Sequence, residues 1–192
     1  MPLGAAKAAL LGAAGTSTGD HAITWIAGAN GTGSSGTLEF TGIPQTYNGL
    51  RIVLSNAQSA TEDQCIWVIN GETSADYKRI EYRTWDTTVE TGLYGSAQAN
   101  YWPFMGVGAI NENVGALMME WHGYTMTSGY HQSWAQSQFG NSNTINTTSV
   151  GGITYQQGSI AAITSIACKI DNASYHWQTP TRIDLYGIGT NA

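Results

Sequence analysis

Histidine, cysteine and carboxylate side chains are the groups through which this chain could bind a metal ion or transfer protons. Its four histidines form no H-x-H or H-x-x-x-H pair, and its two cysteines, Cys65 and Cys168, stand far apart. Zinc sites use closely spaced ligands, and a calcium loop needs several acids around a glycine, which the adjacent Glu62 and Asp63 lack. The spacing predicts no metal and no cofactor, unless strands distant in sequence assemble a site.

Catalytic motifs are equally sparse. The stretch "GTGSSG" places Gly31, Gly33 and Gly36 in a G-x-G-x-x-G pattern. That pattern binds a pyrophosphate only where a helix starts on its last glycine. Here "TLEFTGI" follows, which reads as a strand, so we expect a glycine-rich link. The sequence holds no G-x-S-x-G elbow for a nucleophilic serine. We therefore expect a protein that is not an enzyme.

Aromatic residues are the remaining candidates for a binding surface, since the chain has seven Trp and ten Tyr. Trp and Tyr offer flat apolar area with a polar edge, which suits contact with a sugar or another protein. The alternative is that the rings pack the core, which we expect for Trp67 and Trp121. Both interpretations stay open for the rings next to expected loops, the candidate surface or glycan contacts Trp85, Trp102, Tyr130 and Trp134.

Alternation of apolar and polar residues predicts about eight strands between residues 22 and 188. In "LRIVL" the residues Leu50, Ile52 and Leu54 share one face, and "QCIWVIN" reads as a strand buried on both faces. The other strand candidates are "AITWI", "TLEF", "YKRIEYRTW", "VGALMMEWHGYTM", "ITSIACKI" and "TRIDLYGI".

Turn signals separate these runs, and "NGET" after "QCIWVI" is the clearest of them. No stretch after residue 15 shows a helical apolar stripe. Short strands with no helices between them predict an all-β fold, an antiparallel β-sandwich of jelly-roll type, as one domain over residues 16–192. The residues expected to point into its core in the later strands are Val114, Ala116, Met118, Ile166, Cys168, Ile170, Ile183 and Leu185.

The first fifteen residues, "MPLGAAKAALLGAAG", differ from the rest of the chain. Their only charge, Lys7, falls inside the segment rather than ahead of it, which argues against a secretory signal. A helix this short is marginal in water and becomes ordered by packing on something else. We expect residues 1–15 to be a docking arm, with a mobile terminus as the alternative. Its expected partner-docking residues are Leu3, Ala6, Leu10 and Leu11.

Charge excludes several classes of partner. Charged residues make up 10% of the chain, against about a quarter in an average domain, and the net charge is −6. A nucleic-acid-binding protein would carry a clustered basic face, so we expect no nucleic-acid partner. No run of about 18 apolar residues is present, so we expect no membrane span.

The two cysteines lie inside apolar stretches, "DQCIWVIN" and "IACKI". We expect two buried, reduced thiols that pack as small hydrophobic side chains, with a single disulfide as the alternative. Reduced cysteines fit assembly in a reducing cytoplasm.

Short motifs at both ends of the chain resemble small virion structural proteins of tailed bacteriophages, especially those that infect cyanobacteria. The resemblance covers most of the chain and is carried by the N-terminal segment, by "IPQTYNGL" (Ile43, Pro44, Tyr47, Leu50) and by "LYG" (Leu185–Gly187). It implies a particle component with no catalytic residues, located in the virion after synthesis in the host cytoplasm.

Two functions of different classes follow as expectations. The first is a non-enzymatic phage structural protein in a head decoration, fibre or tail-appendage role. Its arm would dock to other virion proteins, and its sandwich would form a homo-oligomer, such as a trimer, and contact the host surface. The alternative is a carbohydrate-binding module or lectin that uses the loop Trp and Tyr residues.

Overall fold

The computed structural model describes residues 22–61, 63–72, 77–85, 88–98, 105–109, 115–140, 146–155 and 161–189. In these ranges the chain forms strands and no helix, which confirms the all-β prediction. The twelve strands are β1 (Ile23–Asn30), β2 (Thr37–Thr41), β3 (Gly49–Ser59), β4 (Asp63–Ile69), β5 (Tyr77–Trp85), β6 (Thr88–Gln98), β7 (Met105–Ala109), β8 (Gly115–His122), β9 (His131–Gly140), β10 (Asn146–Tyr155), β11 (Ser165–Ile170) and β12 (Arg182–Ile188).

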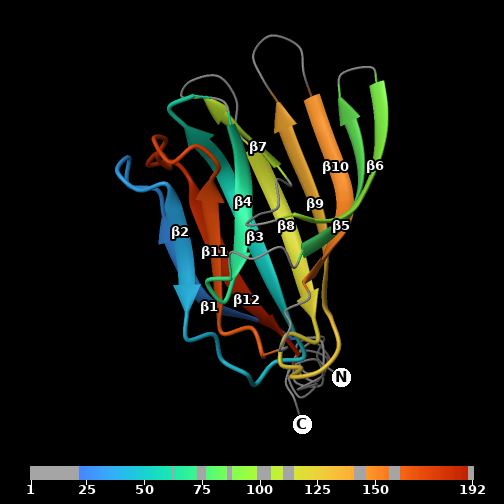
Figure 1. Ribbon diagram of the computed structural model, residues 1–192. Coiled ribbons are helices and arrows are strands. Elements are labelled where there is room, and N and C mark those ends of the chain that lie inside the picture. The colour runs from blue at the N-terminus through green and yellow to red at the C-terminus, as the bar shows by residue number, and fades with distance from the viewer. Residues whose placement is uncertain are drawn as a thin grey trace, which may run out of the picture.

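Two antiparallel sheets pack as a sandwich. Sheet A has the strand order β1-β12-β3-β8-β9-β10-β5-β6, and sheet B has the order β2-β11-β4-β7. A short parallel pairing of β3 with β7 is the exception to the antiparallel arrangement and joins the sheets at one end. In Figure 1, β2, β11 and β4 lie on the left of the view, whereas β10, β5 and β6 of sheet A lie on the right.

The core fills the space between the sheets. Leu50, Ile52 and Leu54 of β3 are all 0% exposed, which confirms the face predicted for "LRIVL". Strand β4 is buried on both faces, as predicted, because Ile66 and Val68 are covered as well as Trp67. Predicted inward residues of β11 and β12 are buried too: Ile166, Cys168, Ile170, Ile183 and Leu185.

The predicted face of β8 was wrong. Leu117, Met119 and Trp121 point into the core, whereas Ala116 is exposed and Met118 is only partly buried. The expected inward residue Val114 lies outside the described residues. Both faces of "GALMMEWH" carry apolar residues, so alternation alone could not decide between them. The larger volume of the Leu, Met and Trp side chains fills the core better.

Four strands had no sequence prediction: β6, β7, β9 and β10. Strand β9 shows why, because its core-facing side chains are His131, Ser133, Ala135 and Ser137, none of them large and apolar. Its opposite face is mostly glutamine. Hydrophobic alternation therefore has no signal there, and pairing with β8 and β10 on either side holds the strand in the sheet.

The "NGET" segment forms the predicted turn. Asn70 and Gly71 both have positive φ angles, 52° and 69°, and the amide of Glu72 donates to the carbonyl of Ile69 at 2.8 Å. This is the geometry of a type I′ turn, which favours Asn-Gly. The strands that it separates are not paired, however, because β4 belongs to sheet B and β5 to sheet A.

The glycine motif forms a link, as predicted, and leads into β2 rather than a helix. A methyl group on Gly31 would lie 2.0 Å from the carbonyl oxygen of Gln178, and one on Gly36 would lie 2.6 Å from that of Tyr175. These glycines let the link pass directly over the backbone of residues 175–178. Their role is close packing and not phosphate binding.

Two of the three segments that carry the phage resemblance meet in space. The ring of Tyr47, from "IPQTYNGL", covers Gly187, from "LYG", so closely that a methyl group there would lie 2.3 Å from the ring. The hydroxyl of Tyr124 donates to the carbonyl of Pro44 and accepts from the amide of Tyr47 at 3.3 Å. The motifs thus form one structural corner of the sandwich.

Candidate functional site

The outer face of sheet A, which points away from sheet B, carries most of the exposed large hydrophobic side chains of the described residues. Among all the described residues, seven large hydrophobic side chains are exposed. By strand register, five of them share this outer face: Ile23, Trp25, Tyr82, Val89 and Trp134. Exposed apolar side chains that share one face in this way are typical of interaction surfaces.

One row of side chains crosses this outer face at a single level. In register order it consists of Trp25, Tyr186, Arg51, Glu120 and Trp134, one each from β1, β12, β3, β8 and β9. We call it the Trp25–Trp134 row. Its two tryptophans are 56% and 42% exposed. Four strand-to-strand steps separate them, about 19 Å at the usual spacing of roughly 4.8 Å.

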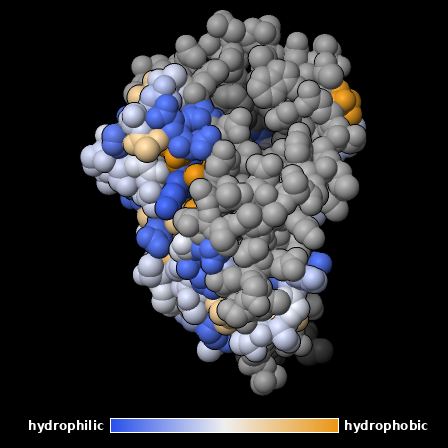
Figure 2. Space-filling view, viewed as in Figure 1, coloured by the Kyte–Doolittle hydropathy of each residue, from blue (hydrophilic) through white to orange (hydrophobic). Residues whose placement is uncertain are grey.

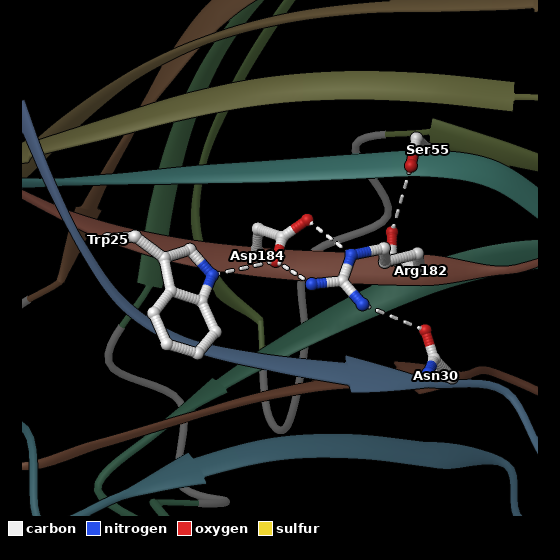
Figure 3. A network of polar contacts seen from close by, with 5 residues as sticks. All are labelled: Trp25, Asn30, Ser55, Arg182 and Asp184. Atoms are coloured by element: carbon white, nitrogen blue, oxygen red, sulfur yellow. Dashed lines mark hydrogen bonds and ion pairs between the residues drawn. The ribbon is translucent and has the colours of Figure 1, made fainter.

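A polar network fixes the Trp25 end of the row (Figure 3). The indole Nε1 of Trp25 donates to Oδ1 of Asp184 at 3.0 Å. Arg182 donates to the same carboxylate twice, from Nε to Oδ2 at 2.8 Å and from Nη2 to Oδ1 at 2.6 Å. Its Nη1 donates to Oδ1 of Asn30 at 3.3 Å. The hydroxyl of Ser55, on β3, donates to the backbone carbonyl of Arg182 at 3.4 Å.

The network sets the charge state of its carboxyl group. Burial alone would raise the pKa of Asp184, but hydrogen bonds from Arg182 and Trp25, together with the positive charge of Arg182, outweigh burial and lower it. The hydrogen bond to Asp184 and the negative charge of that carboxylate in turn raise the pKa of Arg182. The exposed ring of Trp25 is therefore held beside a balanced ion pair.

A second ion pair lies in the middle of the row. Arg51 donates from Nε to Oε1 of Glu120 at 2.7 Å, and its Nη2 contacts the same oxygen. His122, on the outer face one level away, lies with Nε2 3.7 Å from Oε2 of Glu120. Between its two exposed tryptophans the row therefore presents polar groups that are already paired with one another.

The lowered pKa of Asp184 predicts a specific acid sensitivity. A carboxyl group whose folded pKa lies below its unfolded value of about 3.9 stabilises the fold above that pH and loses the contribution as the pH falls further. Asp184→Asn keeps an acceptor for Trp25 but removes the charge. We expect the urea midpoints of wild type and variant to differ by a constant amount above about pH 5 and to converge below about pH 4. A difference that persists unchanged in acid would contradict this role.

The structure separates the predicted contact residues. Trp134 lies on the outer face of sheet A, as described, and Tyr130 is 52% exposed in the segment before β9. Trp85 is the last residue of β5, paired by register with Thr147 and Thr88. Trp102 and the predicted docking residues lie outside the described residues: Leu3, Ala6, Leu10 and Leu11.

His131 is a buried residue that the sequence did not single out. Its Nδ1 lies 3.0 Å from the carbonyl of Gly123 and its Nε2 lies 2.8 Å from the carbonyl of Ala161. A carbonyl only accepts, so both contacts are hydrogen bonds only in the ring that carries a proton on each nitrogen. The imidazole stacks on Tyr155 with the ring centroids 6.0 Å apart. It ties the segment after β8 to the segment before β11, which is a structural role.

The cysteines are both free and fully buried, in agreement with the expected reduced thiols. They lie on neighbouring strands, since Cys168 pairs with Trp67 and Cys65 with Ile170. Burial, followed by the hydrogen bond with Cys65, raises the pKa of the Cys168 thiol well above its ordinary value. Such thiols are poor nucleophiles. Among the residues that the structure describes, no three His, Cys, Asp or Glu side chains gather as metal ligands would.

Trp25 is the binding candidate that sequence reasoning missed. It lies in "AITWI", a stretch too short for its alternation to show which face the ring occupies. The signal was available in "TRIDLYGI", where Arg182, Asp184 and Tyr186 alternate with core residues and so share the outward face. Strand β1 pairs with this strand, β12, and places Trp25 beside Tyr186 on the same outward face. Together they form a surface of aromatic and charged side chains.

Neither a protein-family model nor a curated protein matches this sequence. Within the described ranges there is no helix of the length and apolar character needed to cross a membrane. Figure 2 shows one side of the molecule, where the described residues are mostly hydrophilic or intermediate, in keeping with a surface rich in uncharged polar groups.

Proposed function

We propose that this chain is a non-enzymatic structural protein of a tailed-phage particle. Residues 1–15 dock to another head or tail protein, and the sandwich is displayed as a homo-oligomer with sheet A available for contact. The proposal rests on the resemblance of the N-terminal segment and the "IPQTYNGL" and "LYG" motifs to virion proteins, and on the structural character of the motif residues, which pack against one another at Tyr47 and Gly187.

The observation that carries a contact role is the outer face of sheet A. Five of the seven exposed large hydrophobic side chains on the described residues share it. Burying a large apolar side chain contributes roughly 1.5–3 kcal/mol, so a face with several of them is suited to association. The buried His131 and the two buried thiols have structural surroundings, which gives catalysis no support.

Quantitative mass spectrometry of purified particles tests the proposal. Phage particles are purified from a lysate of infected host cells on a density gradient. They should contain this chain in many copies, at a fixed ratio to the major particle protein. A soluble, particle-free chain at the same total abundance would contradict a virion role. A protein of the lysate that is not part of the particle, followed through the same gradient, controls for carry-over.

A carbohydrate-binding module is the second candidate function. The observation in its favour is the exposure of Trp134 and Tyr130, which are 42% and 52% accessible with polar neighbours. The two functions are compatible, because a displayed particle protein can also bind a surface glycan.

A further inference from the structure

We propose that the Trp25–Trp134 row binds an extended, uncharged oligosaccharide. This inference rests on the second candidate function and assigns it a site and a ligand class. The residues are those of the row itself, together with the Asp184 and Arg182 pair that supports Trp25. Most of them were not among the binding candidates that the sequence provided.

The Trp25 ring is prepared for stacking. Its one polar atom, Nε1, is occupied by Asp184, and that carboxylate is itself fixed by two hydrogen bonds from Arg182. The ring is nevertheless 56% exposed. An exposed aromatic side chain that is already held in place loses little conformational freedom on binding. Its apolar surface is then available to the C–H face of a sugar ring.

Hydrogen-bond donors remain beside this ring. Arg182 has five N–H groups, and three of them are used in its contacts with Asp184 and Asn30. The side-chain amide of Asn30 accepts from Arg182 through Oδ1, which leaves the two N–H groups of Nδ2 to donate to a ligand. A sugar presents hydroxyl oxygens around its ring that can accept from such groups. The combination of one flat apolar platform with a few oriented polar groups is typical of sites that bind small ligands.

The other end of the row supplies a second platform. Trp134 lies four strand-to-strand steps from Trp25, about 19 Å at the usual spacing of roughly 4.8 Å. The Arg51 and Glu120 pair lies between them and is internally satisfied. A ligand with hydroxyl groups can share these hydrogen bonds without leaving a charge unpaired, whereas a purely apolar partner would cover the ion pair and offer it nothing. An oligosaccharide long enough to reach both rings therefore fits the row.

Charge selects the class of glycan. Two ion pairs lie along the row, Arg51 with Glu120 and Arg182 with Asp184, and each pair carries no net charge. The whole chain carries a net charge of −6, which repels polyanions. These charges favour a neutral glycan over a sialylated, sulfated or uronic-acid-rich one.

A glycan array read with the full chain tests this site. The array should carry neutral oligosaccharides from two to eight units beside sialylated and sulfated ones. The best neutral oligosaccharide is then titrated by calorimetry. We expect Trp25→Ala and Trp134→Ala each to weaken binding by roughly tenfold or more. Affinity should rise as the oligosaccharide is lengthened beyond a disaccharide.

Two further variants make the test specific. Met126→Ala removes a large hydrophobic side chain that is 45% exposed but lies outside the row, so binding should be unchanged. Trp25→Phe keeps an aromatic ring and removes the hydrogen bond to Asp184, so its binding should fall between wild type and Trp25→Ala. It also serves if Trp25→Ala does not fold.

Three results would overturn the site: no binding to any neutral glycan, binding only to anionic glycans, or neutral binding that survives both Trp25→Ala and Trp134→Ala. A protein partner that needs the same row, with no glycan bound, would also overturn it. None of these results affects the particle experiment, so failure of the glycan site and failure of the virion proposal are distinguishable.

Discussion

A chain that lacks residues 1–14 is expected to fold like the full chain and yet to be missing from particles. The core of the described sandwich draws on residues from Leu38 to Leu185, so we expect it to form without the segment. We propose that the segment buries Leu3, Ala6, Leu10 and Leu11 against a partner. Burying only two of its three leucines would contribute about 3–6 kcal/mol, so losing the segment should lower incorporation by about two orders of magnitude or more. Quantitative mass spectrometry of particles assembled with the truncated chain measures this.

Two point variants sharpen the deletion experiment. Leu10→Asp combined with Leu11→Asp should reproduce the loss, because charged groups cannot enter an apolar contact without a large cost. Ala13→Ser changes the segment only slightly and should be incorporated normally. Circular dichroism and urea unfolding establish that each chain is folded. Full incorporation of the truncated, folded chain would refute the docking role.

Gly187→Ala is expected to destabilise the sandwich by about 1–3 kcal/mol, the usual cost of forcing extra volume into a packed site. The added methyl group would lie 2.3–2.5 Å from three atoms of the Tyr47 ring, which include Cγ. Cγ is close to the backbone, so the ring cannot swing aside freely. Strand β12 pairs with both β1 and β3, so displacing it affects two strand pairs. The urea midpoint of unfolding measures the loss.

A double variant separates this clash from a general effect on the strand. Tyr47→Ala removes the ring, so adding Gly187→Ala to it should cost much less than adding Gly187→Ala to wild type. Equal costs in the two backgrounds would show that the ring is not the obstacle.

The fold class could be predicted from sequence where strands separate large apolar from polar side chains. Leu50, Ile52 and Leu54 of β3 show this pattern clearly, and the corresponding face is fully buried. The pattern gives no signal for β9, which places His131, Ser133, Ala135 and Ser137 on the face toward the core. Such strands are held by pairing and by their neighbours, and a local reading of hydrophobicity cannot detect that.

The candidate site was harder to predict, because it is assembled across strands. Trp25 and Trp134 are more than a hundred positions apart in sequence, and only strand order brings them into one row. Trp134 is predicted as a candidate because it stands next to an expected loop. Trp25 was not, because the alternation that identifies a strand does not show which of its rings remains exposed.

The location of the chain in an assembled particle tests the central claim most directly. We predict that an electron cryo-microscopy map shows the sandwich on the outside of the head or tail, with residues 1–15 buried against a different virion protein. A map in which the chain is absent, or in which residues 1–15 are folded into the sandwich of their own subunit, would contradict the assignment.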